Sequence, residues 1–212
     1  MSVQGVFMMT RDSSSVSRPR ERIIETASRL FFRQGYCSTG INQIISESGV
    51  AKASFYTHFP SKEDLVIAWL KQREERWIHE LKERVDQHQS TDKRIAAIYS
   101  IWYEQIREEG YRGCGFINMA GEFSNEESPV RAFVRDHKNR VREIIAEHVL
   151  DEYRAVMKPG DFDELVNTIY SLFDGAIVQA QNFMQDWPIK AALKASIHLL
   201  PHDRGEMASP HE

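Results

Sequence analysis

The chain has 212 residues, of which 42% are hydrophobic and 27% are charged, a composition typical of a soluble globular protein. This length can bury a full hydrophobic core in one or two domains. No apolar run approaches the ~20 residues that a membrane-spanning helix needs, so we expect no membrane partner. The apolar patch of residues 6–9 is followed, not preceded, by the basic Arg11, which argues against a signal peptide.

The cysteine content is low, with Cys37 and Cys114 as the two cysteines. Two cysteines cannot form a disulfide framework, and no Cys/His spacing is typical of a zinc site. The sequence therefore predicts no metal and no cofactor. A reducing, cytoplasmic location fits this pattern best.

Charge is distributed unevenly along the chain, whose formal net charge is −4. Residues 17–63 carry seven basic and four acidic side chains, a net +3, which leaves −7 on the chain after Glu63. A basic segment on an acidic body suggests a surface that faces phosphate. Random surface charge is the alternative, and charge alone does not separate the two interpretations.

The first third of the chain predicts a mobile tail over residues 1–16, followed by three helices. Pro19 suits the first turn of a helix that ends before Gly35. Thr39 is expected to cap a second helix, and a third runs from about Ala51 to Phe59.

The rest of the chain predicts six more helices. A capping box at residues 61–64 begins the fourth, which is followed by helices over about 91–110 and 116–123 and a long helix over 129–149. Asp161 and Glu164 form a second capping box before a helix over 162–184, and the last helix runs from about 187 to Pro201. We expect an all-α fold of about nine helices, because no segment alternates with period two.

Residues 41–59 predict a helix-turn-helix, in which two short helices meet at a tight turn around Gly49. At ~100° per residue, Phe55 and Phe59 lie within about 40° of each other and face the first helix. The opposite face of the third helix is small, polar and aromatic, which suits a DNA major groove. The starts of the second and fourth helices, at Thr39 and Lys62, also attract phosphate through backbone N–H groups.

This stretch is similar to the DNA-binding domain of the TetR family of bacterial transcriptional regulators. The resemblance covers residues 20–70 and is strongest from Gly49 to Leu65, GVAKASFYTHFPSKEDL. One departure is Ile45, where the family usually has a small residue. The resemblance implies that Lys52, Tyr56, Thr57, His58 and Lys62 contact DNA. The full set of candidate DNA-binding residues is Thr39, Lys52, Ala53, Ser54, Tyr56, Thr57, His58 and Lys62.

The resemblance implies a TetR-like architecture, with a three-helix DNA-binding domain over residues 17–64 and a helical effector-binding and dimerisation domain over 65–201. Residues 202–212 are expected to form a tail. The helix over 162–184 is apolar on nearly every face and needs burial on several sides, which fits a four-helix dimer interface. A monomeric core is the alternative. Candidate interface residues are Phe173, Ile177, Ala180, Ala192 and Ala195.

Aromatic residues of the C-terminal domain are candidates for a pocket that takes a small hydrophobic or aromatic effector. Each of them taken alone is more often a core residue, and the pocket hypothesis depends mainly on the family. The candidates are Tyr99, Trp102, Tyr103, Phe116, Met119, Phe123, Phe133 and Phe173.

Cys114 lies in the glycine-rich segment 112–116 at the start of a short helix, where a nearby arginine and the helix N-terminus favour a reactive thiolate. The hypothesis of a redox or electrophile sensor stands beside that of a small buried hydrophobe.

The function predicted from the sequence is a homodimeric DNA-binding repressor that a small-molecule effector releases from its double-stranded operator. No phosphate-binding loop, zinc-protease helix or nucleophile elbow occurs, so we expect no enzymatic activity. His137 and His148 lie on the apolar face of the long helix and are either core histidines or ligand contacts. A helical adaptor that binds proteins through its small domain is the remaining alternative.

Overall fold

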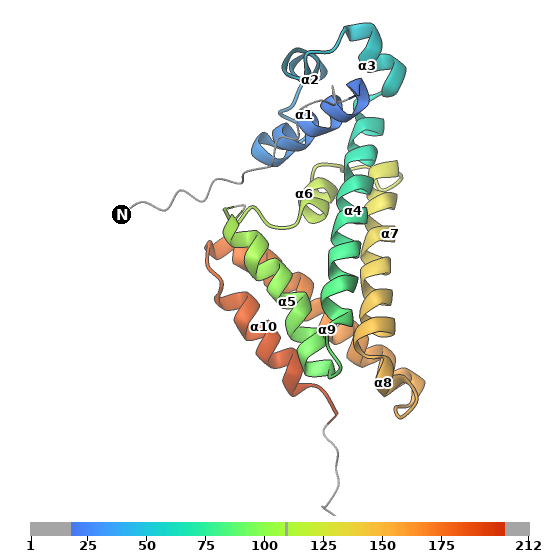
Figure 1. Cartoon of the computed structure of the whole chain (residues 1–212), viewed down its shortest axis with the longest axis vertical. Coiled ribbons are helices and arrows are strands. Elements are labelled where there is room, and N and C mark those ends of the chain that lie inside the picture. Colours follow the sequence, from blue (N-terminus) through green and yellow to red (C-terminus); the bar gives the residue numbers. More distant parts are fainter. Residues whose placement is uncertain (1–17, 109, 202–212) are drawn as a thin grey trace, which may run out of the picture.

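A computed structural model describes residues 18–108 and 110–201 (Figure 1). The predicted tails, residues 1–16 and 202–212, lie outside the described residues. Within those two ranges the chain forms ten α-helices and one π-helical turn and no β-strand, which confirms the all-α prediction. None of these helices is long and apolar enough to cross a bilayer. The helices are α1 (Pro19–Gln34), α2 (Ile41–Ser48), α3 (Lys52–His58), α4 (Lys62–Asp86), α5 (Thr91–Glu108), α6 (Gly115–Gly121), α7 (Pro129–Ile144), α8 (Asp151–Arg154), α9 (Pro159–Phe183) and α10 (Trp187–His198).

Helices α1, α2 and α3 form a small head at one end of the molecule, and α4 extends from it into the body (Figure 1). Ile23, Ile44 and Phe55, one from each head helix, are fully buried. The Trp69 indole of α4 donates a hydrogen bond to Ser28 of α1 at 2.9 Å, so the long helix is fixed to the head.

The start of α4 is the capping box that the sequence predicts. Ser61 Oγ accepts a hydrogen bond from the Asp64 backbone N–H, and the Asp64 carboxylate accepts one from the Ser61 N–H. These two bonds provide acceptors for backbone N–H groups that have no hydrogen-bond partner within the helix. The box therefore fixes where α3 ends and α4 begins.

The body is a bundle in which α4 runs beside α7, while α5 and α10 pack together with α9 (Figure 1). Leu81, Ile95 and Ile145 are fully buried where these helices meet. Helix α6 is short and lies between the head and the bundle.

The predicted helix over residues 129–149 is divided in the structure. Helix α7 ends at Ile144 and continues as a π-helical turn (Ile145–Val149), and α8 follows as a helix that the sequence pattern does not predict. Val149 and Leu150 are both fully buried, and the wider turn allows these consecutive apolar side chains to face inward.

Two capping predictions are wrong. Helix α2 begins after Gly40, without a side-chain cap, because the Thr39 hydroxyl instead donates to the Gly35 carbonyl at 2.6 Å. Helix α9 begins at Pro159, before Asp161 and Glu164, because proline is favoured in the first turn, where its missing N–H has no helical partner.

Candidate DNA-binding surface and ligand cavity

The turn between α2 and α3 has the geometry of a helix-turn-helix. Gly49 closes α2 in the left-handed region, with φ of +64°, a conformation that strains residues with a Cβ. Val50 then turns into the core before α3 begins at Lys52. This left-handed backbone conformation explains why a glycine forms the tight turn that the sequence predicts at Gly49.

Helix α1 holds both short helices in place. Arg29 forms an ion pair with Glu47 of α2 at 2.7 Å, and the Gln34 amide donates to Gln43 at 3.0 Å. Ile45, the departure from the family pattern, is half-buried against the core. The two-helix unit is therefore supported along its length by α1.

The side of α3 that faces away from the core is exposed. Lys52, Ala53, Tyr56, Thr57 and His58 all lie on it, and the Tyr56 side chain is 43% exposed. The Thr57 hydroxyl donates to the Ala53 carbonyl at 2.9 Å, so it keeps lone pairs for a donor on DNA. The structure thus leaves five of the eight candidate DNA-binding residues exposed along α3.

The other three candidates lie elsewhere. Thr39 is 1% exposed, and Ser54 is half-buried at the edge of α3. Lys62 donates to the Tyr36 carbonyl at 2.5 Å, with its ammonium 3.8 Å from the centre of the Tyr36 ring. Burial lowers the pKa of Lys62, against the opposing influence of Cys37 and Glu122. Lys62 therefore supports the loop after α1 in this structure.

A cavity of about 570 Å³ lies in the body between α4, α5, α7 and α9, next to the start of α6. This volume is in the range of small-molecule sites. Four aromatic rings line it, together with Ile101, Val141, Ile177 and the Cys114 thiol. The aromatic lining residues are Trp77, Trp102, Phe116 and Phe173.

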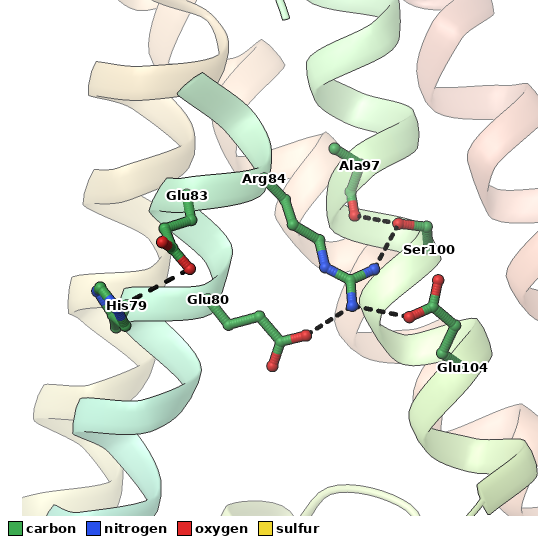
Figure 2. Close-up of polar contacts among 7 residues, drawn as sticks. All are labelled: His79, Glu80, Glu83, Arg84, Ala97, Ser100 and Glu104. Carbon is green, nitrogen blue, oxygen red and sulfur yellow. Dashed lines mark hydrogen bonds and ion pairs between the residues drawn. The ribbon is translucent and has the colours of Figure 1, made fainter. Parts of the chain in front are cut away.

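Charged residues at the edge of the cavity are largely paired with each other. Arg84 of α4 lies 2.7 Å from both Glu80 and Glu104 and donates to Ser100 of α5 at 3.3 Å (Figure 2). The hydrogen bond from Arg84 lowers the pKa of Glu104. This cluster fixes α5 against α4 beside the cavity.

Lys138 of α7 forms a second pair, with Asp174 of α9, inside the cavity lining. Its ammonium also lies 4.0 Å from the Cys114 sulfur. The cavity wall therefore joins a cysteine, a lysine and an aspartate from three different helical segments.

His137 is buried in the same wall, where its ring stacks on Phe116 with centroids 3.5 Å apart and planes 9° apart. Its Nδ1 lies 3.0 Å from the Glu74 carboxylate, which also receives two hydrogen bonds from Arg140 at 2.9 and 3.0 Å. Burial, with smaller contributions from Lys138 and Arg140 and against the opposing influence of Asp174, lowers the pKa of His137 to about 3. The imidazole is therefore neutral at physiological pH.

Comparison with known proteins finds family matches for the head with its helix-turn-helix and for the body with its cavity. Residues 23–69 match the family described as bacterial regulatory proteins, tetR family, and residues 91–196 match the tetracyclin repressor-like C-terminal domain. The chain belongs to the TetR family. It is thus a DNA-binding transcriptional regulator by family, and the helix-turn-helix of α2 and α3 is the DNA-binding unit of that family.

Individual relatives show how the similarity is distributed. The Bacillus subtilis regulator YxaF is 59% identical over 49 residues, which is 23% of this chain but only 26% of YxaF. The Escherichia coli repressor NemR is 23% identical over 178 residues, covering 82% of this chain and 89% of NemR. The crystal structure of SCO4454, a TetR-family regulator from Streptomyces coelicolor, has a TM-score of 0.76 at 27% identity and covers 85% of this chain and 93% of that one.

Three of the eight pocket residues predicted for this TetR-family chain line the cavity, namely Trp102, Phe116 and Phe173. The other five point elsewhere, because residues three or four positions apart on a helix can face different neighbours. The Tyr99 hydroxyl forms a hydrogen bond with Ser196 at 2.8 Å, and the Tyr103 hydroxyl accepts one from Arg107 at 2.9 Å. Met119 lines a second hollow beside Phe31. Phe123 packs on Tyr36, and Phe133 lies under the Arg140 guanidinium.

The predicted dimer-interface residues lie mostly inside the protomer. Phe173, Ile177, Ala180 and Ala192 are between 0% and 7% exposed, and Ala195 is half-buried. Side chains already buried in one chain add little area to an interface. The open faces of α9 and α10 carry other residues, which the sequence pattern does not single out.

Sequence reasoning also misses the contact that links the head to the body. Glu122, directly after α6, accepts hydrogen bonds from the backbone N–H groups of Tyr36 at 2.8 Å and Cys37 at 2.6 Å. Nearby, the Ser128 hydroxyl donates to Glu63 at 3.0 Å. Trp77, Lys138 and Arg84 in the cavity are likewise missed, because their helices reveal no functional pattern.

Proposed function

We propose that this TetR-family chain is a dimeric repressor that leaves its operator when a small aromatic compound enters the body cavity. The observation that carries the proposal is the path of α4, one uninterrupted helix of 25 residues. Its first residues lie against the head, and Trp77 and Arg84 further along line the cavity. A ligand in the cavity therefore contacts the same rigid element that holds the DNA-binding head.

Release from the operator depends on the distance between the two DNA-binding heads of a dimer. Successive major grooves are about 34–36 Å apart, so both recognition helices enter DNA only at that separation. A ligand that binds better to a body with wider-spaced heads lowers DNA affinity by the difference in its binding free energy between the two states.

For DNA binding we propose Lys52, Tyr56, Thr57 and His58 as contacts, with Ala53 allowing close approach of α3. Lysine neutralises phosphate, and the hydroxyl and imidazole groups suit phosphates and base edges. Because operator DNA lies in the bacterial cytoplasm, a cytoplasmic location is part of this proposal.

The dimer is proposed to use the outward faces of α9 and α10. Thr168, Ser171, Gly175 and Gln179 follow one another along the exposed side of α9 at helical spacing, and no atom lies within 4 Å of a Cβ built on Gly175. An exposed stripe of uncharged residues with a glycine in it allows a second helix pair to approach closely. Gly175→Arg is expected to give a monomer in light scattering.

The experiment for the whole proposal is fluorescence anisotropy with the duplex upstream of the chain's own gene, at several salt concentrations. Tight, steeply salt-dependent binding that outcompetes scrambled DNA supports the regulator, because phosphate contacts release counterions. A set of aromatic compounds is then added, and release by at least one of them supports the effector. Absence of binding to a broad pool of genomic fragments contradicts the proposal and favours the adaptor alternative.

A second candidate is sensing of electrophiles through Cys114, favoured by its place in the cavity wall, 4.0 Å from the Lys138 ammonium. Treatment with N-ethylmaleimide is expected to release DNA from the wild type and not from Cys114→Ser, with the exposed Cys37 replaced in both proteins. Equal release from both contradicts this candidate.

A further inference from the structure

The hydrogen-bonding state of His137 is fixed by its partners. Glu74 receives one hydrogen bond from Arg140 on each carboxylate oxygen, so both oxygens act as acceptors. The Nδ1 atom of His137, 3.0 Å away, must therefore carry the proton. In a neutral imidazole this leaves Nε2 with a lone pair and no hydrogen.

That lone pair has no hydrogen-bond partner among the described residues, although His137 is only 4% exposed and lines the cavity. Its charged neighbours are Glu74 and Arg140 on one side and Lys138 and Asp174 on the other. Each of these groups is paired with another. Around the His137 ring the charges are therefore paired with each other, and Nε2 is the acceptor atom that the ring itself offers to a ligand.

Much of the remaining buried lining is aromatic, beside aliphatic side chains and the Cys114 thiol. Phe116 covers one face of the His137 ring, the Trp77 ring lies 6.1 Å from it, and the Phe173 ring lies 6.5 Å from Trp77. The indole N–H groups of Trp77 and Trp102 are also buried without a partner in the described part of the chain. Polar groups buried without partners are unfavourable, and a site made for a purely apolar molecule would not need them.

We propose that His137 Nε2 accepts a hydrogen bond from the bound ligand, so that the cavity selects neutral, planar aromatic compounds with a hydroxyl or N–H donor on the ring edge. This inference rests on the proposed function of the cavity as the effector site. The inference narrows the effector from any aromatic compound to one that carries a hydrogen-bond donor. It assigns this selectivity to the Nε2 atom of His137, whose ring is held in place by Glu74 and, through Glu74, by Arg140.

The test compares two probes of nearly equal shape by isothermal titration calorimetry on the full-length protein. 2-Naphthol carries a donor, whereas 2-methoxynaphthalene has the same ring and an oxygen that can only accept. One neutral hydrogen bond corresponds to about a tenfold preference for 2-naphthol. The variant His137→Phe keeps a ring against Phe116 and is expected to bring this preference to about one, by losing affinity for 2-naphthol alone.

His148→Phe is the matched control, because His148 follows the same helix but does not line the cavity. It is expected to keep the full preference. Equal affinity of the wild type for the two probes overturns the selection by His137 and leaves the proposed effector cavity standing. Failure of both probes to bind contradicts the aromatic cavity and this inference together. The wild-type comparison does not depend on the folding of any variant.

Discussion

Glu122 is predicted to contribute measurably to stability through the loop after α1. Glu122→Gln keeps the size of the side chain but removes its charge and turns one acceptor into an amide donor that faces a backbone N–H. Hydrogen bonds to charged groups are each worth about 1.5–3 kcal/mol. The carboxylate accepts two, from Tyr36 and Cys37, and the glutamine retains one neutral bond. Because the site is partly exposed, we expect a loss of about 2 kcal/mol in the free energy of unfolding.

Urea denaturation measures this loss, and thermal melting should show a decrease of about 4–8 °C for a chain of this length. Burial raises the pKa of Glu122, but the N–H groups of Cys37 and Tyr36 outweigh it and the net pKa is lowered. The contribution is therefore present above the unfolded pKa, about 4.3, and lost as pH falls through the lower folded value.

Glu126→Gln is the control, because Glu126 is exposed in the same loop. The reasoning is refuted if Glu122→Gln is no less stable than this control. It is also refuted if the difference between wild type and Glu122→Gln is unchanged between neutral pH and a pH below the lowered folded pKa of the Glu122 carboxyl.

Three further predictions concern DNA binding, the α4 cap and the buried histidine. Lys52→Ala should weaken operator binding and reduce the slope of log affinity against log salt by about one, whereas Lys71→Ala, exposed on α4, should leave the slope unchanged in anisotropy titrations. Ser61→Ala should cost about 1 kcal/mol in urea denaturation, since Asp64 N–H loses its acceptor, and an equal loss in Ser124→Ala would contradict this. The folded pKa of His137 is lowered to about 3, so the unfolded chain binds the proton first as pH falls below about 6.5. From pH 7 to 5 the wild type should therefore lose roughly 2 kcal/mol more stability than His137→Phe, and parallel profiles would refute the buried neutral state.

The head was predictable because its signals are local. Gly49 marks a left-handed turn, Pro19 marks a helix start and Ser61 with Asp64 forms a cap, and each acts within four residues of sequence. Burial of Phe55 and Phe59 follows from helical spacing alone. Because these two rings pack toward the core, the opposite face of α3 is exposed.

The cavity was less predictable because its lining depends on how helices rotate against each other. Tyr99 and Trp102 are one turn apart on α5, yet Tyr99 bonds to Ser196 of α10 while Trp102 lines the cavity. A periodic pattern identifies both as apolar and cannot distinguish core from cavity. For the same reason periodicity does not reveal that Phe173 and Ile177 of α9, which the sequence suggests for a dimer interface, line the cavity of the protomer.

Helix α6 shows why the coupling between the two functional regions needs the structure. Its seven residues extend about 10 Å, with Cys114 and Phe116 at the start in the cavity wall and Glu122 directly after its end. Glu122 holds amides 85 and 86 residues earlier in the chain, a separation at which sequence periodicity carries no information. In the sequence Glu122 resembles any solvated loop carboxylate. In the fold it joins the short helix that borders the cavity to the loop that precedes α2, so we expect the proposed effector to act on the head through α6 as well as through α4 when it displaces Phe116.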